Sequence, residues 1–222
     1  MNNVLAITGT LLLLGAGCAS LPLEANLPAE TATQTAALPQ AIPSEPAKAQ
    51  PVRSVSALGL PLDRANERIS KKPFGLYVTP KDSPVSPERF SGYHVGVDFE
   101  TFDDEQDRDV VVSAICDGEL ALKKLSDGYG GVAVQRCLLD NEPITVVYGH
   151  LRLESIDAKA GDVLKRGERL GALGKGYGAE TDGERKHLHL GVHRGTAITV
   201  RGYVQTKAEM GQWLDARLYF PM

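Results

Sequence analysis

The feature that most constrains the fold is a series of short segments with strand character that fills the chain after about residue 57. These segments are rich in Val, Ile and Leu, and Gly, Pro and Asp separate them. Short apolar runs bounded by turn residues are typical of antiparallel β structure. We therefore predict a mostly β fold, a single antiparallel β domain over residues 57–222 with few short helices, one of them over residues 61–69. The predicted strands cover residues 75–79, 94–99, 110–115, 119–124, 132–138, 144–150, 169–173 and 187–193.

The residues before this domain have a different composition. Residues 4–14 form an apolar run that is too short to span a bilayer and is followed by small residues, which predicts a signal peptide over residues 1–17. Residues 18–56 are rich in Ala, Pro, Thr, Glu and Gln, and this composition predicts a disordered linker. We therefore expect an exported protein with a long tether before its folded domain.

The sequence Leu-Gly-Ala-Gly-Cys at residues 14–18 resembles a bacterial lipobox. The resemblance implies that Cys18 becomes the lipidated N-terminus and anchors the chain to a membrane, facing the periplasm or the cell wall. Ala19 stands where lipoproteins of the inner membrane often have Asp, so the outer membrane is slightly favoured. The alternative is an ordinary cleaved signal peptide with an incidental Cys18, and both interpretations predict export.

Charge and cysteine content narrow the function further. The net charge of -4 provides no basic excess, so we predict no binding to nucleic acid. Cys116 and Cys137 flank a predicted hairpin whose Gly-rich turn spans residues 126–131, which places the two thiols nearly opposite each other. Because exported proteins meet an oxidising environment, a disulfide is possible, and two buried free thiols are an equally good alternative.

Four of the five histidines lie in three short motifs. His187 and His189 are two residues apart in a predicted strand, so both imidazoles project from one face. His94 and Asp98 would lie about 13 Å apart in a straight strand, so we expect a bend at Gly96 to bring them together. A His-Asp-His set suits zinc, although each motif alone is weak evidence for a metal site.

The three motifs together resemble those of the lysostaphin-like (LytM-type) zinc metallopeptidases. The resemblance rests on His-Val-Gly-Val-Asp at 94–98, Tyr-Gly-His-Leu at 148–151 and His-Leu-His at 187–189, in that order, and extends over residues 68–215. It implies an antiparallel β domain of the lysostaphin type and an enzyme that hydrolyses peptide bonds in the cross-links or stem peptides of peptidoglycan. The implied ligands of one zinc ion per chain are His94, Asp98 and His189.

The same resemblance assigns proton transfer and oxyanion stabilisation to His150 and His187. The alternative is a non-catalytic relative that binds peptidoglycan or activates an amidase. His193 is expected to be structural, and Trp213 is expected to pack into the core. Residues 103–109 resemble a calcium loop only loosely, and we predict a solvated acidic turn there. The charged segment 181–186 is either a wall of the substrate groove or a surface loop.

Overall fold

The computed structural model describes residues 58–221 of the 222-residue chain. The predicted signal peptide, the predicted lipidation at Cys18 and the predicted linker lie outside these residues and stay predictions. Within residues 58–221, no helix is long and apolar enough to cross a membrane. The structure consists of antiparallel sheets with few short helices, which confirms the predicted fold class.

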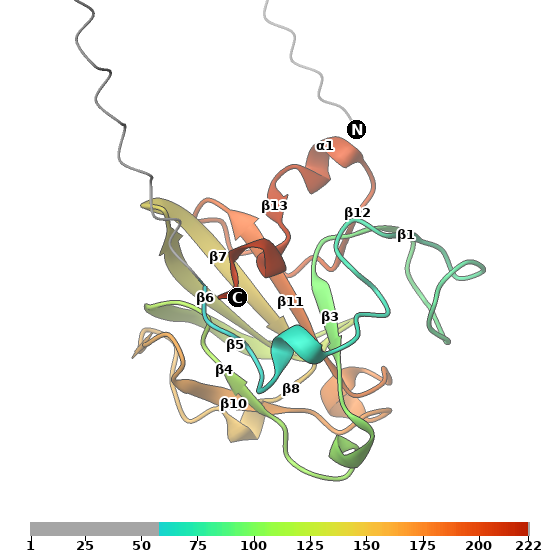
Figure 1. Ribbon diagram of the computed structural model, residues 1–222, viewed down its shortest axis with the longest axis horizontal. Helices are drawn as coiled ribbons and strands as arrows, with labels where there is room; N and C mark the ends of the chain where they lie inside the picture. The colour runs from blue at the N-terminus through green and yellow to red at the C-terminus, as the bar shows by residue number, and fades with distance from the viewer. Residues whose placement is uncertain (1–57, 222) are drawn as a thin grey trace, which may run out of the picture. The chain divides into compact units, whose positions relative to one another are not determined.

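A central antiparallel sheet carries the candidate site (Figure 1). Strand β11 pairs along one edge with β7 and along its other edge first with β3 and then with β13. Beyond β7 the sheet continues through β6 and β5 to β9. Its strands are β3 (Val97–Glu100), β5 (Gly118–Ser126), β6 (Gly130–Leu139), β7 (Glu142–Gly149), β9 (Val163–Leu164), β11 (His187–Arg194) and β13 (Trp213–Leu214).

Two smaller three-stranded sheets complete the β structure. One contains β1 (Tyr77–Val78), β2 (Gly92–His94) and β12 (Tyr203–Val204), and the other contains β4 (Val111–Ser113), β10 (Arg169–Leu173) and β8 (Leu151–Arg152). The helices are α1 (Lys207–Met210) and the 3₁₀ turns η1 (Ala65–Glu67), η2 (Asp103–Glu105), η3 (Leu153–Ser155), η4 (Ala179–Thr181) and η5 (Ala216–Tyr219).

Two local predictions are wrong. The helix predicted over residues 61–69 is reduced to η1, because Arg64 has a left-handed φ of 52° that an α-helix cannot continue. The strand predicted over residues 94–99 is two strands, since β2 ends at His94 and β3 begins at Val97. Strands β8, β9, β12 and β13 have two residues each, too few to produce a periodic pattern in the sequence.

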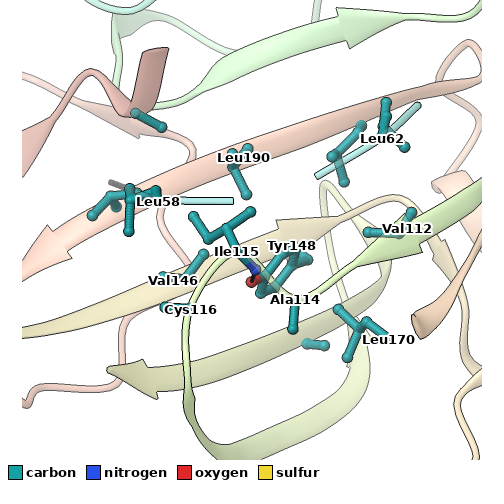
Figure 2. Packing of buried hydrophobic residues seen from close by; sticks show 14 of the residues in the cluster. Leu58, Leu62, Val112, Ala114, Ile115, Cys116, Val146, Tyr148, Leu170 and Leu190 are labelled. Atoms are coloured by element: carbon teal, nitrogen blue, oxygen red, sulfur yellow. Dashed lines mark hydrogen bonds between the residues drawn. The ribbon is translucent and has the colours of Figure 1, made fainter. Parts of the chain in front are cut away.

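Alternation along the strands separates an apolar face from the site face. On β11, Leu188 and Leu190 join the larger core cluster, whereas His187 and His189 point to the opposite face. Figure 2 shows Leu190 among the residues of this cluster, together with Tyr148 of β7. Each fully buried leucine in such a core contributes about 1.5–3 kcal/mol. The packing of this face therefore fixes the register that presents the histidines.

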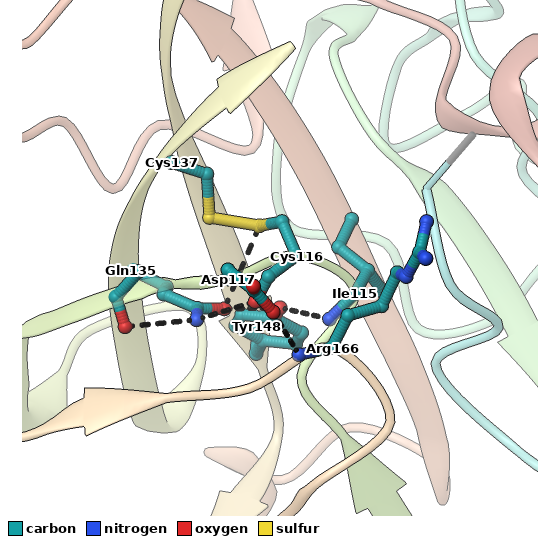
Figure 3. The surroundings of a disulfide bond; sticks show 8 residues. Ile115, Cys116, Asp117, Gln135, Cys137, Tyr148 and Arg166 are labelled. Carbon is teal, nitrogen blue, oxygen red and sulfur yellow. Dashed lines mark hydrogen bonds between the residues drawn. A yellow bond between two sulfur atoms is a disulfide. The ribbon is translucent and has the colours of Figure 1, made fainter. Parts of the chain in front are cut away.

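Strands β5 and β6 form the predicted hairpin, and Cys116 and Cys137 form a disulfide beside it (Figure 3). Their Cα atoms are 6.1 Å apart. Next to the disulfide, the Tyr148 hydroxyl donates to Gln135 Oε1 and accepts from the Ile115 amide, at 2.9 Å in both cases. These buried hydrogen bonds connect the hairpin, strand β7 and the segment after β4.

The acidic segment over residues 103–109 is a largely exposed turn, as predicted, with Glu105 as its one buried residue. Glu105 is buried and accepts hydrogen bonds from Arg68 Nη1 at 2.6 Å and Arg68 Nη2 at 2.9 Å. The buried Lys186 ammonium donates to the main-chain oxygens of Glu105, Gln106 and Arg108, at 2.8, 3.2 and 2.6 Å. A side-chain cation therefore occupies the position at which the carbonyl groups of this loop converge.

Candidate functional site

The register of the central sheet brings the candidate residues together. His189 on β11 lies opposite Asp98 on β3 and opposite Gly149 on β7. Residues directly opposite each other in a sheet project from the same face. His187 precedes His189 by two residues and shares that face, and His150 follows Gly149 immediately. Residues that are far apart in the sequence therefore meet around one point of the sheet.

His94 reaches this point across the bend that we expected at Gly96. Residues 95 and 96 separate β2 from β3, so that His94 and Asp98 belong to different sheets. Gly96 does not have a left-handed backbone, so its backbone conformation does not require glycine. A Cβ atom at this position would instead overlap the His189 imidazole. Glycine is therefore required for space rather than for backbone freedom.

Three ligand atoms form a compact triangle. His94 Nε2 lies 3.0 Å from His189 Nδ1, and Asp98 Oδ1 lies 3.2 Å from each of these nitrogens. The three side chains are buried. Among residues 58–221 this is the one group of His, Cys, Asp or Glu side chains whose ligand atoms are close enough to hold a metal ion.

Main-chain carbonyl groups fix the orientation of two of the histidines. The Pro73 oxygen lies 3.2 Å from His94 Nδ1, and the Arg185 oxygen lies 2.9 Å from His187 Nδ1. A carbonyl oxygen only accepts, so in both residues Nδ1 donates its proton and Nε2 keeps a free lone pair. His94 Nε2 therefore faces the triangle, and His187 Nε2 lies 3.3 Å from Asp98 Oδ2.

Burial and neighbouring charges set the ionisation of the site. Burial opposes the charged form of Asp98, but the neighbouring His94 and His187 hold its pKa well below its ordinary value. Burial, followed by the proximity of His187, lowers the pKa of His150 well below 6.5. Burial is also the largest cause that lowers the pKa of His189, to about 4. The imidazoles of His150 and His189 are thus neutral beside an ionised Asp98, and metal binding requires a neutral imidazole and an ionised carboxylate as ligands.

A cavity of about 280 Å³ opens on these residues. His150 and His187 lie side by side in it, with ring centroids 4.2 Å apart. The Tyr129 ring packs 5.1 Å from the His189 ring and 5.5 Å from the His150 ring. Tyr129 has room there because Gly149 lacks a side chain, and a Cβ at that position would overlap the tyrosine ring. The cavity is lined by residues 72, 90, 91, 98, 127–129, 150, 184, 187, 189, 200–203 and 205.

Two cations that the sequence analysis missed flank Asp98. Arg185 Nη2 donates to Asp98 Oδ2 at 3.0 Å, and Lys72 Nζ lies 3.6 Å from the same oxygen. Each cation has a second carboxylate partner, Glu100 for Arg185 and Glu88 for Lys72. The position of Arg185, two residues before His187, could have indicated that its side chain lies near the site. Nothing in the sequence around Lys72 indicated its role.

The charged segment 181–186 is therefore more than a surface loop. Glu184 lines the cavity. Asp182 is hydrogen-bonded to two other loops, one that contains Gly128 and one that contains Arg89. Asp182 Oδ2 accepts from the Gly128 amide at 2.7 Å and from Arg89 Nη2 at 2.8 Å. The wall of the cavity thus consists of loops that are hydrogen-bonded to one another.

His193 lies on the same strand as His187 and His189 but not in the cavity. Its ring packs 4.8 Å from the ring of Trp213, which is buried in the smaller core cluster. Both observations agree with the expectation that His193 is structural and that Trp213 packs into the core.

Comparison with known proteins identifies the domain. Residues 92–200 match the model of Peptidase family M23, whereas no curated protein sequence matches the chain. The SpoIIQ–SpoIIIAH pore forming complex contains a chain of the same fold, with a TM-score of 0.51 and 15% identity over 75% of this chain and 92% of that one.

Two other solved structures are similar in sequence to a comparable degree. The catalytic domain of the antimicrobial peptidase lysostaphin from Staphylococcus simulans has a TM-score of 0.49 and 19% identity, over 71% of this chain and 96% of that one. CbpA from L. salivarius REN has a TM-score of 0.48 and 22% identity, over 74% of this chain and 95% of that one. With the three motifs in order inside the matched segment, residues 92–200 form a domain of Peptidase family M23.

Proposed function

We propose that this chain is a zinc metalloendopeptidase that hydrolyses peptide bonds in the cross-links or stem peptides of peptidoglycan. The observation that carries the proposal is the triangle of His94, Asp98 and His189, with two further histidines in the same cavity. A structural metal site would be closed by a fourth protein ligand, whereas three ligands beside an open cavity are typical of a catalytic site.

The donor set fits one zinc ion per chain. Zinc binds His nitrogen and Asp oxygen at about 2.0–2.2 Å, so two ligands of a tetrahedral site lie about 3.3 Å apart. The three separations in this site are 3.0, 3.2 and 3.2 Å. Bound there, zinc would supply a Lewis acid for the polarisation of the scissile carbonyl group.

His187 and His150 supply the proton chemistry in this proposal. His187 Nε2 keeps its lone pair, because Nδ1 donates to the Arg185 oxygen, so His187 can accept the proton of an attacking water. His150 lies beside it, and burial keeps its imidazole neutral. A neutral imidazole can donate a hydrogen bond to the oxygen on which negative charge develops.

The substrate and the location of the enzyme rest on the sequence. The resemblance to the lysostaphin-like peptidases favours peptidoglycan, and the predicted export through residues 1–17 agrees with that substrate. We propose that a lipid on Cys18 holds the protein at a membrane, with the outer membrane slightly favoured, and that residues 18–56 let the domain reach the wall.

The test combines zinc analysis with the release of muropeptides from purified sacculi. The parent chain is expected to hold one zinc and to release fragments. His189→Ala is expected to lose the metal, and His187→Ala to keep the metal but lose about 10²–10⁴-fold in rate. His193→Ala is the matched control, because it changes a histidine of the same strand outside the cavity, and it should keep both properties.

Each outcome distinguishes between functions. A parent chain that holds zinc but releases nothing from any sacculus would favour the non-catalytic alternative, a peptidoglycan-binding or amidase-activating lipoprotein. A parent chain without zinc would contradict the site itself.

A further inference from the structure

Arg185 joins the candidate metal site to a second carboxylate on the same strand. Its Nη2 donates to Asp98 Oδ2 at 3.0 Å, and its Nε donates to Glu100 Oε2 at 2.8 Å. Asp98 and Glu100 are two residues apart on β3, so their side chains share a face. The side chains of Arg185 and Glu100 are 11% and 12% exposed, which shields these hydrogen bonds from water.

Because of this contact, the two oxygens of Asp98 have different partners. Oδ1 belongs to the triangle, 3.2 Å from His94 Nε2 and from His189 Nδ1. Oδ2 points away from the triangle and accepts the hydrogen bond from Arg185. One oxygen is thus presented to a metal while the guanidinium group holds the other.

Without that hydrogen bond, Asp98 Oδ2 can turn toward the triangle, so that both oxygens bind the same ion. His187 Nε2 already lies 3.3 Å from Oδ2 while Arg185 is in place. Lys72 does not replace Arg185, because its ammonium lies 3.6 Å from Oδ2 and donates to Tyr203 Oη at 2.7 Å. The planar fork of an arginine suits this bridging geometry better than an ammonium group does.

We propose that Arg185, itself held by Glu100, is a positioning residue that keeps Asp98 a ligand through one oxygen. This inference rests on the proposed metal site and goes beyond it, since it concerns a residue that binds no metal itself. Partners that orient a metal ligand typically contribute a 10–100-fold difference in metal affinity.

The test compares Arg185→Ala, Arg185→Lys and Arg152→Ala with the parent chain. Arg152 is the matched control, because it makes a two-point contact with Asp109 and does not line the cavity. Zinc affinity is measured by competition with a chromophoric chelator, and the coordination of substituted Co²⁺ by its visible absorption, which weakens as the number of ligands increases.

For Arg185→Ala we expect a zinc dissociation constant raised about 10–100-fold and a weaker Co²⁺ absorption. Arg185→Lys should be intermediate or equally impaired, because an ammonium group cannot bridge both carboxylates in the same way. Arg152→Ala should match the parent chain in both measurements.

The outcomes separate this inference from the proposed function. If the parent chain binds zinc and Arg185→Ala has the same dissociation constant and spectrum, the positioning function is refuted and the metal site stands. A lower dissociation constant would show that Arg185 acts only as a repelling charge, which also refutes the inference. A parent chain that binds no metal overturns both proposals.

If Arg185→Ala does not fold, Glu100→Gln decides the question. This variant keeps the guanidinium group but removes the charged partner that holds it. We expect a change in the same direction and of smaller size, and unchanged zinc affinity and an unchanged Co²⁺ spectrum would overturn the inference.

Discussion

Removal of the disulfide between Cys116 and Cys137 should destabilise the domain without affecting its candidate site. The perturbation is the double variant Cys116→Ala/Cys137→Ala, in a Cys18→Ala background that leaves no other thiol in the chain. In the β6 register, Val132 lies opposite Gly149 near the site, whereas Cys137 lies opposite Ile144, five residues farther along the strand. The bond is therefore remote from the chemistry.

The expected magnitude follows from the length of chain that the bond closes. The two cysteines are 21 residues apart in sequence. Closing a loop of this length in the unfolded chain lowers its entropy by an amount worth about 3 kcal/mol at 25 °C. For a domain of this size, that loss of stability corresponds to a fall in Tm of about 6–12 °C.

The assay is urea unfolding followed by circular dichroism, with and without a reducing agent, on the double variant and on its parent with the disulfide. Reduction should lower the unfolding midpoint of the parent to that of the double variant, and should leave the variant unchanged. Zinc content of the folded protein should be equal in both.

Two results would refute this reasoning. If the double variant is as stable as its oxidised parent, the disulfide does not form or does not constrain the unfolded chain. If zinc content falls together with stability, the hairpin and the site are coupled more closely than the register indicates.

Three further predictions concern single residues. Glu105→Gln should reduce stability by about 2 kcal/mol at neutral pH, because it removes the charged partner of Arg68. The hydrogen bond from Arg68 lowers the pKa of Glu105 below 4.5. This stabilisation is therefore present above about pH 4.5 and is lost as the pH falls through the lower pKa of the folded state. The stability of Glu105→Gln in urea unfolding should accordingly depend less on acid than that of the parent chain. Gly96→Ala should abolish tight zinc binding in a chelator competition, since the added methyl group overlaps the His189 imidazole. Tyr148→Phe should cost about 1–3 kcal/mol in urea unfolding, because it leaves two buried partners of the hydroxyl without a hydrogen bond.

Each of these predictions has a control. Asp104→Asn changes an exposed carboxylate next to Glu105 and should leave the acid sensitivity of the domain unaltered. Gly178→Ala adds a methyl group at a glycine with ordinary backbone and adequate space, so zinc binding should persist. Equal zinc affinity of Gly96→Ala and its parent would contradict the packing described around His189. Equal stability of Tyr148→Phe and its parent would show that the Ile115 amide and Gln135 find other partners.

The sequence predicted the four long strands of the central sheet, β5, β6, β7 and β11, because their apolar residues alternate or cluster over five residues or more. The same alternation predicted that His187 and His189 share a face, as they do. Strands β8, β9, β12 and β13 were not predictable, since they depend on pairing with distant segments rather than on their own pattern.

The surroundings of the site were harder to predict than its histidines. That His189 lies opposite Asp98 depends on the register between two strands about 90 residues apart, which the sequence does not encode locally. The contacts of Lys72 and Arg185 with Asp98 depend on the same long-range pairing. The composition of a charged loop does not indicate which of its side chains such pairing buries.

The ammonium group of Lys186 has a practical consequence for metal-removal experiments. Three main-chain carbonyl groups of the acidic loop converge on it, and burial lowers its pKa from 10.5. Because this cation is covalently attached to the chain, a chelator cannot extract it. Treatment with a chelator should therefore leave the loop folded, so that any activity lost and then restored by added zinc reports on the histidine site alone.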